Sequence, residues 1–303
     1  MAEILDCLVI GGGPAGLTAS LYLTRFRRSV LVADEGRSRA SWIPRSHNFP
    51  GFPEGVNGKD LLARLKSQAE DYGFPDWAGG VQALKRNGDG IWAVTLSDRQ
   101  VRAKTILIAT GVVDRRPPLR GCDDAVRQAL LRFCPICDGF EAKGERIAVI
   151  GNDDHAARET LFLRTYSARL TLLSLGAADM SREFRDRLAA SGVPVVAVRP
   201  DSLAIDDSKL VALTIEGEHL EPFEVVYAAL GVEPQNQLVQ SLGAMTDDSG
   251  CLQVDRHQQT VVPGVYAAGD VVRGLHQISV AIGEAAIAAT AIHNSLPPAP
   301  ARA

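Results

Sequence analysis

Two stretches of the chain repeat the same order of apolar and polar positions. The first, Cys7–Asp34, reads CLVIGGGPAGLTASLYLTRFRRSVLVAD, and the second, Ile147–Ser174, reads IAVIGNDDHAARETLFLRTYSARLTLLS. In both, a short apolar run is followed by a turn, an amphipathic helical stretch and a second apolar run, and LYLTRF aligns with LFLRTY without a gap. A β-α-β unit that occurs twice predicts an α/β protein with two Rossmann-like, doubly wound domains.

The turn of the first copy carries the dinucleotide-binding fingerprint. Gly11 permits a tight turn, Gly13 lets a pyrophosphate approach the backbone, and Gly16 lets helix and strand pack closely. The amide groups at the start of the helix then favour phosphate. Asp34, followed by Glu35, ends the second apolar run, where an acidic side chain accepts hydrogen bonds from a ribose. We therefore expect the first copy to bind a dinucleotide.

The turn of the second copy departs from this pattern where a phosphate would come closest. Asp153 replaces the second glycine and stands between Asn152 and Asp154. A side chain at this position blocks the backbone approach, and its carboxylate repels a pyrophosphate. The simpler alternative is a helix cap, which stabilises a helix by about 1 kcal/mol. The two interpretations agree, because a carboxylate then takes the favourable place at the helix N-terminus that a phosphate would occupy.

The end of the second copy also lacks nucleotide-binding residues. It offers Ser174, Leu175 and Gly176, with neither an acid for a ribose 2′-hydroxyl nor arginines for a 2′-phosphate. We predict that the second dinucleotide site is lost while its fold is kept.

A C-x-x-C pair, Cys134 and Cys137, lies just before the second copy. Five cysteines in the chain fit no secreted disulfide framework, so the pair indicates redox chemistry. Asp138, directly after the pair, is a candidate proton donor or acceptor. A zinc site would need two further ligands, and Cys122 and His155 are the nearest in sequence. We therefore expect no metal.

Composition narrows the classes of partner. The net charge is −4 and basic residues are scattered, which argues against nucleic acid. No apolar run reaches the roughly 18 residues of a membrane span. The N-terminal segment lacks the basic region of a signal peptide, so we expect a cytoplasmic protein without a membrane anchor.

A series of further motifs makes a family resemblance specific. GGGPAG, HNFPGFP, ILIATG, CPICDGFE, ALGVEPQ, GVYAAGDV and HQISVAIGEAAIAA follow one another along nearly the whole chain. With these motifs in this order, the chain resembles the low-molecular-weight thioredoxin reductase family. The resemblance implies a homodimer, and an FAD domain split by an inserted domain of the pyridine-nucleotide type. We place the FAD domain at residues 1–113 and 235–303 and the inserted domain, with its C-x-x-C, at residues 114–234.

The resemblance also implies roles for individual residues. Cys137 would contact the flavin, Cys134 would exchange with the substrate disulfide, and Asp138 would shuttle the proton. The expected FAD-binding residues are Gly11, Gly13, Pro14, Ala15, Gly16, Asp34, Glu35, Asn48, Val81, Thr110, Gly111, Gly269, Asp270, His276, Gln277 and Ile278.

The sequence departs from the family at the residues that would bind the electron donor. The family's Gly-x-Gly-x-x-Ala becomes Gly-Asn-Asp-Asp-His-Ala at residues 151–156, and its basic clamp for NADPH aligns with residues 174–176. We therefore expect an FAD-dependent dithiol/disulfide oxidoreductase that uses NADPH poorly and is linked instead to ferredoxin or oxygen. Its substrate would be a thioredoxin-like protein or a small dithiol or disulfide.

Two alternatives stay open at this stage. One is an NADPH-dependent thioredoxin reductase, favoured by the retained motif ALGVEPQ at residues 229–235. The other, of a different class, is a flavin-binding redox sensor without turnover.

Overall fold

The computed structural model describes residues 4–73, 77–176 and 178–298. The chain divides into two compact units. Unit 1 consists of residues 1–42, 56–113 and 233–303, and unit 2 consists of residues 43–55 and 114–232. Unit 1 is thus built from segments on both sides of unit 2 in the sequence, and residues 43–55 cluster with unit 2 rather than with their neighbours along the chain.

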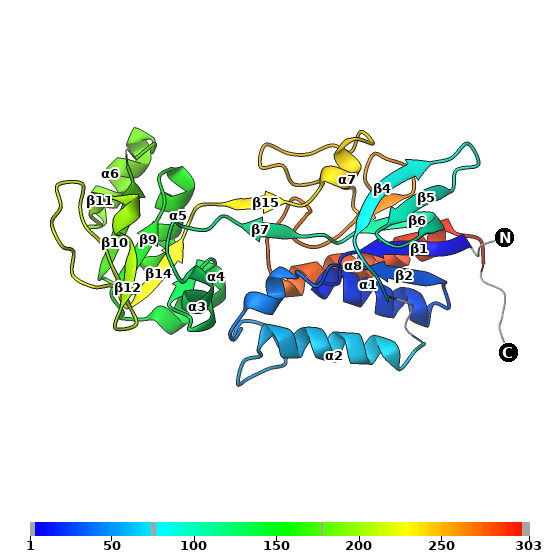
Figure 1. Cartoon of the computed structure of the whole chain (residues 1–303), viewed down its shortest axis with the longest axis horizontal. Helices are drawn as coiled ribbons and strands as arrows, with labels where there is room; N and C mark the ends of the chain where they lie inside the picture. The colour runs from blue at the N-terminus through cyan, green and yellow to red at the C-terminus, as the bar shows by residue number, and fades with distance from the viewer. Residues whose placement is uncertain (1–3, 74–76, 177, 299–303) are drawn as a thin grey trace. The chain divides into compact units, whose positions relative to one another are not determined.

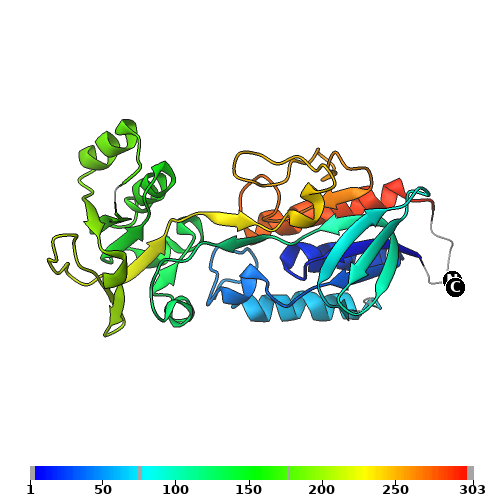
Figure 2. The ribbon, with the colours of Figure 1, turned by 45° about the horizontal axis from the view of Figure 1, so that its top comes forward.

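Unit 1 contains a mixed sheet whose parallel part includes the first β-α-β copy. Its strand order is β3 (Trp77–Ala78), β2 (Val30–Ala33), β1 (Ile4–Ile10), β6 (Gln100–Ile108), β5 (Trp92–Leu96) and β4 (Val81–Arg86), and β16 (Val265–Ala267) also pairs with β6. Strands β1, β2, β3, β6 and β16 are parallel, whereas β4 and β5 join the sheet antiparallel. Figure 2 shows β4 and β5, in cyan, extending the sheet beyond β6.

Helices cover one face of this sheet. They are α1 (Pro14–Arg25) and α8 (Ile278–Ser295), which Figure 1 shows side by side against the strands, and α2 (Gly58–Glu70) packs on α1. Alternate residues of β1 enter separate cores because side chains of a strand point to opposite faces. Cys7 and Val9 pack with α1 and α8, and Leu8 and Ile10 pack with the opposite core.

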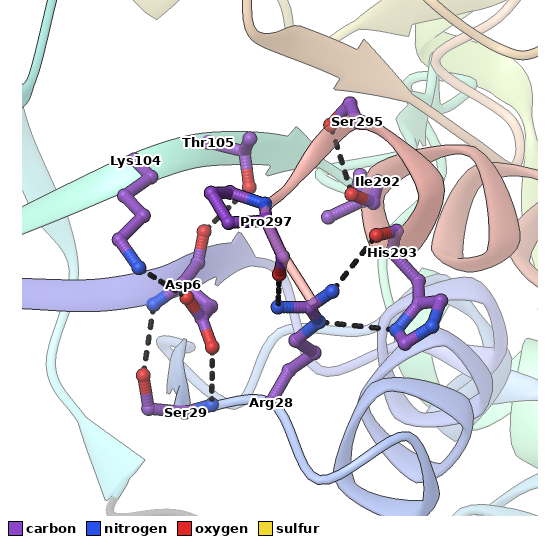
Figure 3. Close-up of polar contacts among 9 residues, drawn as sticks. All are labelled: Asp6, Arg28, Ser29, Lys104, Thr105, Ile292, His293, Ser295 and Pro297. Carbon is purple, nitrogen blue, oxygen red and sulfur yellow. Dashed lines mark hydrogen bonds and ion pairs between the residues drawn. The ribbon is translucent and has the colours of Figure 1, made fainter. Parts of the chain in front are cut away.

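Buried polar groups fix the ends of these elements in unit 1 (Figure 3). Arg28, which is buried, donates to His293 Nδ1 at 3.0 Å, to the His293 carbonyl at 2.9 Å and to the Pro297 carbonyl at 2.8 Å. A cation among the last carbonyls of α8 satisfies acceptors that the helix leaves free. Asp6 accepts from Lys104 Nζ at 2.7 Å and from the Ser29 amide at 3.1 Å, which ties β1 to β6 and to the start of β2.

Unit 2 contains a parallel sheet built around the second copy. Its strand order is β11 (Val195–Val198), β10 (Leu170–Leu175), β9 (Ile147–Ile150), β14 (Val225–Ala228) and β8 (Leu131–Arg132). Its helices include α3 (Cys122–Arg127), α4 (Pro135–Asp138), α5 (Asp154–Leu163) and α6 (Arg182–Ala190), and β12 (Ala204–Asp206) and β13 (Lys209–Val211) form a hairpin. The strands β9 and β14 are buried along their whole length, as expected of parallel strands covered on both faces.

Besides the two ends of the segment 43–55, the chain passes between the units at β7 (Val112–Asp114) and β15 (Val232–Pro234). These two strands pair with each other, and α7 (Gln237–Gln240) follows in unit 1. The two sheets confirm the predicted α/β fold with two Rossmann-like domains. The copies appear as β1-α1-β2 and β9-α5-β10. Among the described residues, the structure holds no helix of the length and apolar character that crossing a membrane requires.

Candidate dinucleotide and cystine sites

The glycine-rich turn of unit 1 lies between β1 and α1, and two of its glycines, Gly11 and Gly16, have no room for a side chain. Gly11 has φ +111°, and a Cβ there would lie 2.3 Å from the Ala109 carbonyl oxygen. A Cβ on Gly16 would lie 1.8 Å from the Gly11 carbonyl oxygen. Gly13 is the N-cap of α1, Pro14 and Ala15 follow it, and no side chain of the described residues caps this end. The first amide groups of α1 are therefore available to an anion.

A cavity of about 330 Å³ lies beside this turn. It is lined by Gly12, Leu17, Asp34, Gly36, Ser38, Ser41, Leu62, Ala63 and Lys66. The Asp34 carboxylate stands 2.5 Å from where a Cβ on Gly12 would lie, so the acid faces the glycine turn directly. Glu35 forms an exposed ion pair with Arg37 and packs against Gly80. The free helix terminus, the acid and the cavity together fit the adenosine diphosphate half of FAD.

Further predicted flavin residues meet at the carboxyl ends of β1, β6 and β16, where ligands of doubly wound sheets bind. A Cβ on Gly269 would lie 2.9 Å from Ala15 Cβ, so the loop after β16 comes against the first turn of α1. Asp270 forms an ion pair with Arg39 at 2.9 Å. The Thr110 hydroxyl donates to the Gln235 carbonyl, and the Gly111 carbonyl accepts from the Gln235 amide at 2.9 Å.

The start of α8 contributes the next group of predicted residues. Gln277 is the N-cap of α8 in an extended conformation and Ile278 is the first helical residue. His276 Nε2 lies 3.9 Å from Cys251 Sγ. Cys251 therefore contacts a predicted flavin residue.

The last two predicted flavin residues lie on β4 and on the segment 43–55. Val81 begins β4 and pairs with Leu96 of β5, on the antiparallel side of the sheet. Asn48 belongs to the segment 43–55 of unit 2, where its side-chain amide donates to the Ile136 carbonyl at 3.4 Å.

The C-x-x-C pair of unit 2 is oxidised. Cys134 and Cys137 form a disulfide, with Cα atoms 5.3 Å apart. Cys134 is the N-cap of the one-turn helix α4, and the Cys137 amide donates to the Cys134 carbonyl at 3.0 Å. Ile136 and Phe140 beside it are 50% and 69% exposed, so a substrate would meet an apolar surface around the cystine.

Asp138 ends α4, one helical turn after Cys134, and is held by two side chains. Tyr227 Oη donates to Asp138 Oδ1 at 2.8 Å, and Arg132 Nη1 donates to the Asp138 carbonyl at 2.8 Å. Burial raises the pKa of the Asp138 carboxyl to about 6, although the Arg132 charge and the Tyr227 hydrogen bond oppose this shift. Burial, and then the nearby Asp138 charge, raises the pKa of the Tyr227 phenol, so the phenol remains a donor.

Sequence reasoning missed Arg132 and Tyr227. Their signal was a polar side chain in or beside an apolar strand: Arg132 stands two residues before Cys134, and Tyr227 lies in the run VVYAAL. A buried polar side chain needs a partner, but the sequence does not say which one.

In the second copy, the N-terminus of α5 is occupied by the chain's own side chains. Asp153 is the N-cap, and its Oδ1 accepts from the Ala156 amide at 3.0 Å. Asn152 Oδ1 accepts from the Leu175 amide at 2.8 Å, and Asp154 Oδ1 accepts from the Ser181 amide at 2.7 Å. The three residues thereby cap the helix and tie down the segment that follows β10. Among residues 4–73, 77–176 and 178–298, no cluster of three or more His, Cys, Asp or Glu could hold a metal.

Comparisons with known proteins identify the family. The family model described as pyridine nucleotide-disulphide oxidoreductase matches residues 5–285. Thioredoxin reductase of Listeria monocytogenes is 29% identical over 297 residues, which cover 94% of this chain and 92% of that protein. Thioredoxin reductase of Streptomyces clavuligerus is 32% identical over 284 residues, 90% and 87% of the two chains. The crystal structure of thioredoxin reductase from Streptococcus pyogenes has a TM-score of 0.88 at 27% identity, covering 97% of this chain and 98% of that one.

A nucleotide-binding turn in one Rossmann-like unit and a cystine in the other define a flavoprotein disulfide oxidoreductase. The chain belongs to the pyridine nucleotide-disulphide oxidoreductase family, and within it to the proteins of the thioredoxin reductase type. FAD is the cofactor that this family implies.

Proposed function

We propose that the protein is an FAD-dependent dithiol/disulfide oxidoreductase that does not use NADPH efficiently. Electrons would pass between the flavin, the Cys134–Cys137 pair and a thioredoxin-like protein or small dithiol. The observation that carries the proposal is the N-terminus of α5, where Asn152, Asp153 and Asp154 bond to the chain itself.

Charge and the loss of hydrogen-bond donors both disfavour NADPH. A nucleotide phosphate at α5 would face the Asp153 and Asp154 carboxylates, and it would compete with Asp153 for the Ala156 amide. The end of β10 offers no arginine at residues 174–176 to bind a 2′-phosphate. Each missing charge-assisted hydrogen bond removes about 1.5–3 kcal/mol, so the affinity would fall by several orders of magnitude.

Unit 1 would hold FAD. The pyrophosphate would lie over Gly11, Gly13 and the first amides of α1, and the adenosine ribose would bond to Asp34. The residues around Gly269 and the start of α8 would line the rest of the cofactor, with Asn48 and Val81 as further proposed contacts. Bound FAD would supply a two-electron redox centre.

A dithiol substrate would reduce the cysteine pair in two thiol–disulfide exchange steps. A substrate thiolate attacks Cys134 Sγ, the Cys134–Cys137 bond breaks, and Cys137 Sγ takes the electron pair and a proton from Asp138. The second substrate thiol then attacks the mixed disulfide and releases Cys134. A pKa of about 6 for Asp138 leaves both of its protonation states accessible near neutral pH.

The other redox partner is proposed to be ferredoxin or oxygen, and the assembly a homodimer. We also keep the proposed domain limits, with FAD bound by residues 1–113 and 235–303 and the inserted domain at residues 114–234. On α6, Arg182 and Arg187 form ion pairs with Asp186 and Glu183, so this helix does not present a basic face to an acidic partner.

An NADPH-dependent thioredoxin reductase is the alternative with a specific observation in its favour. The relatives compared above are named thioredoxin reductase. In addition, the Ala229 carbonyl oxygen lies 2.8 Å from where a Cβ on Gly151 would be, so ALGVEPQ retains its close approach to the end of β9.

An anaerobic titration of the purified flavoprotein distinguishes the two functions. NADPH, NADH and dithiothreitol are added in separate experiments while the flavin absorbance is followed. We expect dithiothreitol to bleach the flavin and millimolar nucleotide to leave it oxidised. Stoichiometric bleaching by NADPH within seconds would establish the alternative. A sensor without turnover would instead keep any steady-state activity unchanged in Cys134→Ser.

A further inference from the structure

Arg132 and Tyr227 reach Asp138 from two neighbouring strands of unit 2. Strands β8 and β14 are parallel, and Tyr227 lies directly opposite Arg132 in their register. Tyr227 is fully buried, and the Arg132 side chain is 12% exposed. Two polar side chains held this firmly in a sheet define one orientation for the group that they bind.

The contacts form a chain of donors that ends at the carboxylate. Arg132 Nη1 donates to Tyr227 Oη at 3.4 Å, and Tyr227 Oη donates to Asp138 Oδ1 at 2.8 Å. Arg132 is itself fixed, because its Nε donates to the Ala129 carbonyl at 3.0 Å and its Nη1 to the Asp138 carbonyl at 2.8 Å. Linked hydrogen bonds of this kind polarise one another, and so the carboxylate gains a stronger donor.

The charges around Asp138 act in opposite directions. The Arg132 guanidinium lies 4.0 Å from Oδ1 and favours the carboxylate, as does the Tyr227 hydroxyl. Burial and the Glu141 carboxylate favour the neutral acid. Neither form is strongly excluded, which is the condition for a group that gives and then takes back a proton.

We propose that Arg132 and Tyr227 are positioning residues that orient the Asp138 carboxyl for proton transfer with the cysteine pair and set the pH range of that transfer. This inference rests on the proposed function, in which Asp138 serves Cys134 and Cys137. When Cys137 leaves as a thiolate and takes the Asp138 proton, the new carboxylate is stabilised by the Tyr227 hydroxyl and the Arg132 charge. In the reverse reaction the carboxylate takes the proton back from the Cys137 thiol, so no further oxidant or acid is consumed.

The test measures reduction of the cystine in the oxidised holoprotein by dithiothreitol under anaerobic conditions. Samples are quenched with iodoacetamide, and the modified Cys134 and Cys137 are counted by mass spectrometry. Rates are divided by the concentration of dithiothreitol thiolate at each pH. In the wild type the normalised rate should fall as Asp138 loses its proton.

Removing a group that favours the carboxylate should move this fall to higher pH. Tyr227→Phe should raise the midpoint by about one pH unit, because a hydrogen bond to a charged acceptor is lost. Arg132→Gln should raise it too, and Arg132→Lys, which keeps the charge, should bring the midpoint most of the way back to its wild-type value. Tyr166→Phe is the matched control: the Tyr166 ring packs near Gly139, next to Asp138, and loss of its hydroxyl should leave the midpoint unchanged.

Asp138→Asn separates the failure of this inference from failure of the proposed function. If this variant removes the pH-dependent fall, but Tyr227→Phe and Arg132→Gln leave the wild-type midpoint in place, the positioning role is overturned and the function stands. If Asp138→Asn keeps the fall, Asp138 is not the proton donor and the positioning role is overturned, whereas a wild-type cystine that dithiothreitol fails to reduce would overturn the proposed function. Should Tyr227→Phe not fold, the comparison of Arg132→Gln with Arg132→Lys decides the question alone.

Discussion

Gly16 and Ala156 occupy equivalent positions in the two β-α-β copies, yet the room around them differs. A Cβ on Gly16 would lie 1.8 Å from a main-chain oxygen, that of Gly11. Ala156 carries a Cβ that is accommodated because Gly151 opposite has none. The turn of the first copy thus excludes at Gly16 the methyl group that the turn of the second copy accepts at Ala156.

Gly16→Ala should therefore disturb both the fold and the flavin site of unit 1. Backbone atoms cannot move aside as a flexible side chain could, so we expect a loss of about 1–3 kcal/mol in stability and most of the bound flavin. The ratio of flavin to protein absorbance and a thermal unfolding curve measure the two effects. Gly88→Ala is the control, since a Cβ there meets no atom within 4 Å. Full flavin content in Gly16→Ala would contradict the packing argument.

Asp138 links stability to pH. The pKa of the Asp138 carboxyl in the folded protein, about 6, lies above the 3.8 of an exposed aspartate. The stability that protonated Asp138 contributes is therefore fully present below pH 3.8 and is lost as pH rises through about 6. Asp138→Asn cannot ionise, and its Oδ1 can still accept from Tyr227. We expect the variant to be about 1–3 kcal/mol more stable than the wild type near pH 8 and equally stable near pH 4.

Urea unfolding of both oxidised proteins at the two pH values tests this expectation. Asp248→Asn, at an exposed position, should follow the wild type at both. An Asp138→Asn variant that is less stable near pH 8 would show that the ionised carboxylate is favoured by the fold.

At the scale of elements, α1 and α5 start in the same way but satisfy their first amides differently. Gly13 leaves the N-terminus of α1 without a side-chain cap among the described residues, whereas the Asp153 carboxylate caps α5. The same helix dipole therefore favours a ligand in one unit and the chain's own acid in the other. Of the two interpretations weighed for Asp153 from sequence, the cap is confirmed, and the repulsion of a phosphate stays a prediction.

Asp153→Ala should weaken unit 2 through α5. Loss of an N-cap acceptor lowers the free energy of unfolding by about 1 kcal/mol. Urea unfolding followed by circular dichroism would measure this change. Asp186→Ala on α6 is the control, because it removes an exposed acid that forms an i,i+4 ion pair with Arg182. It should change the free energy of unfolding by a few tenths of a kcal/mol, roughly the contribution of such a pair. Equal effects in the two variants would mean that the cap adds nothing beyond a surface charge.

At the scale of the whole molecule, the candidate site residues are divided between two units. The glycine turn, Asp34, Gly269 and the start of α8 belong to unit 1, and the cystine with Asp138 belongs to unit 2. Each unit has its own core, so a change in the cysteine pair need not alter the turn that would bind FAD.

The double variant Cys134→Ser, Cys137→Ser should therefore keep its flavin and lose its reaction with dithiols. We expect wild-type flavin content and a rate of flavin reduction by dithiothreitol at least about 100-fold lower, since the groups that exchange with the dithiol are gone. Flavin absorbance of the purified protein and stopped-flow kinetics give the two values. Cys122→Ser, which removes a thiol outside the pair, should behave as the wild type. An unchanged rate in the double variant would exclude the cysteine pair as the route to the flavin.

The sequence alone determined the features that depend on neighbouring residues. The duplicated β-α-β pattern, the glycine turn at residues 11–16 and the C-x-x-C pair are all local, because strand and helix periods and the needs of a tight turn act over a few positions. Tertiary structure decided which distant groups meet these features. Tyr227 is 89 positions from Asp138, and only the pairing of β14 with β8 brings its hydroxyl to that carboxylate. In the same way, the alignment of β10 beside β9 lets Asn152 bond to Leu175, a contact that no local pattern specifies.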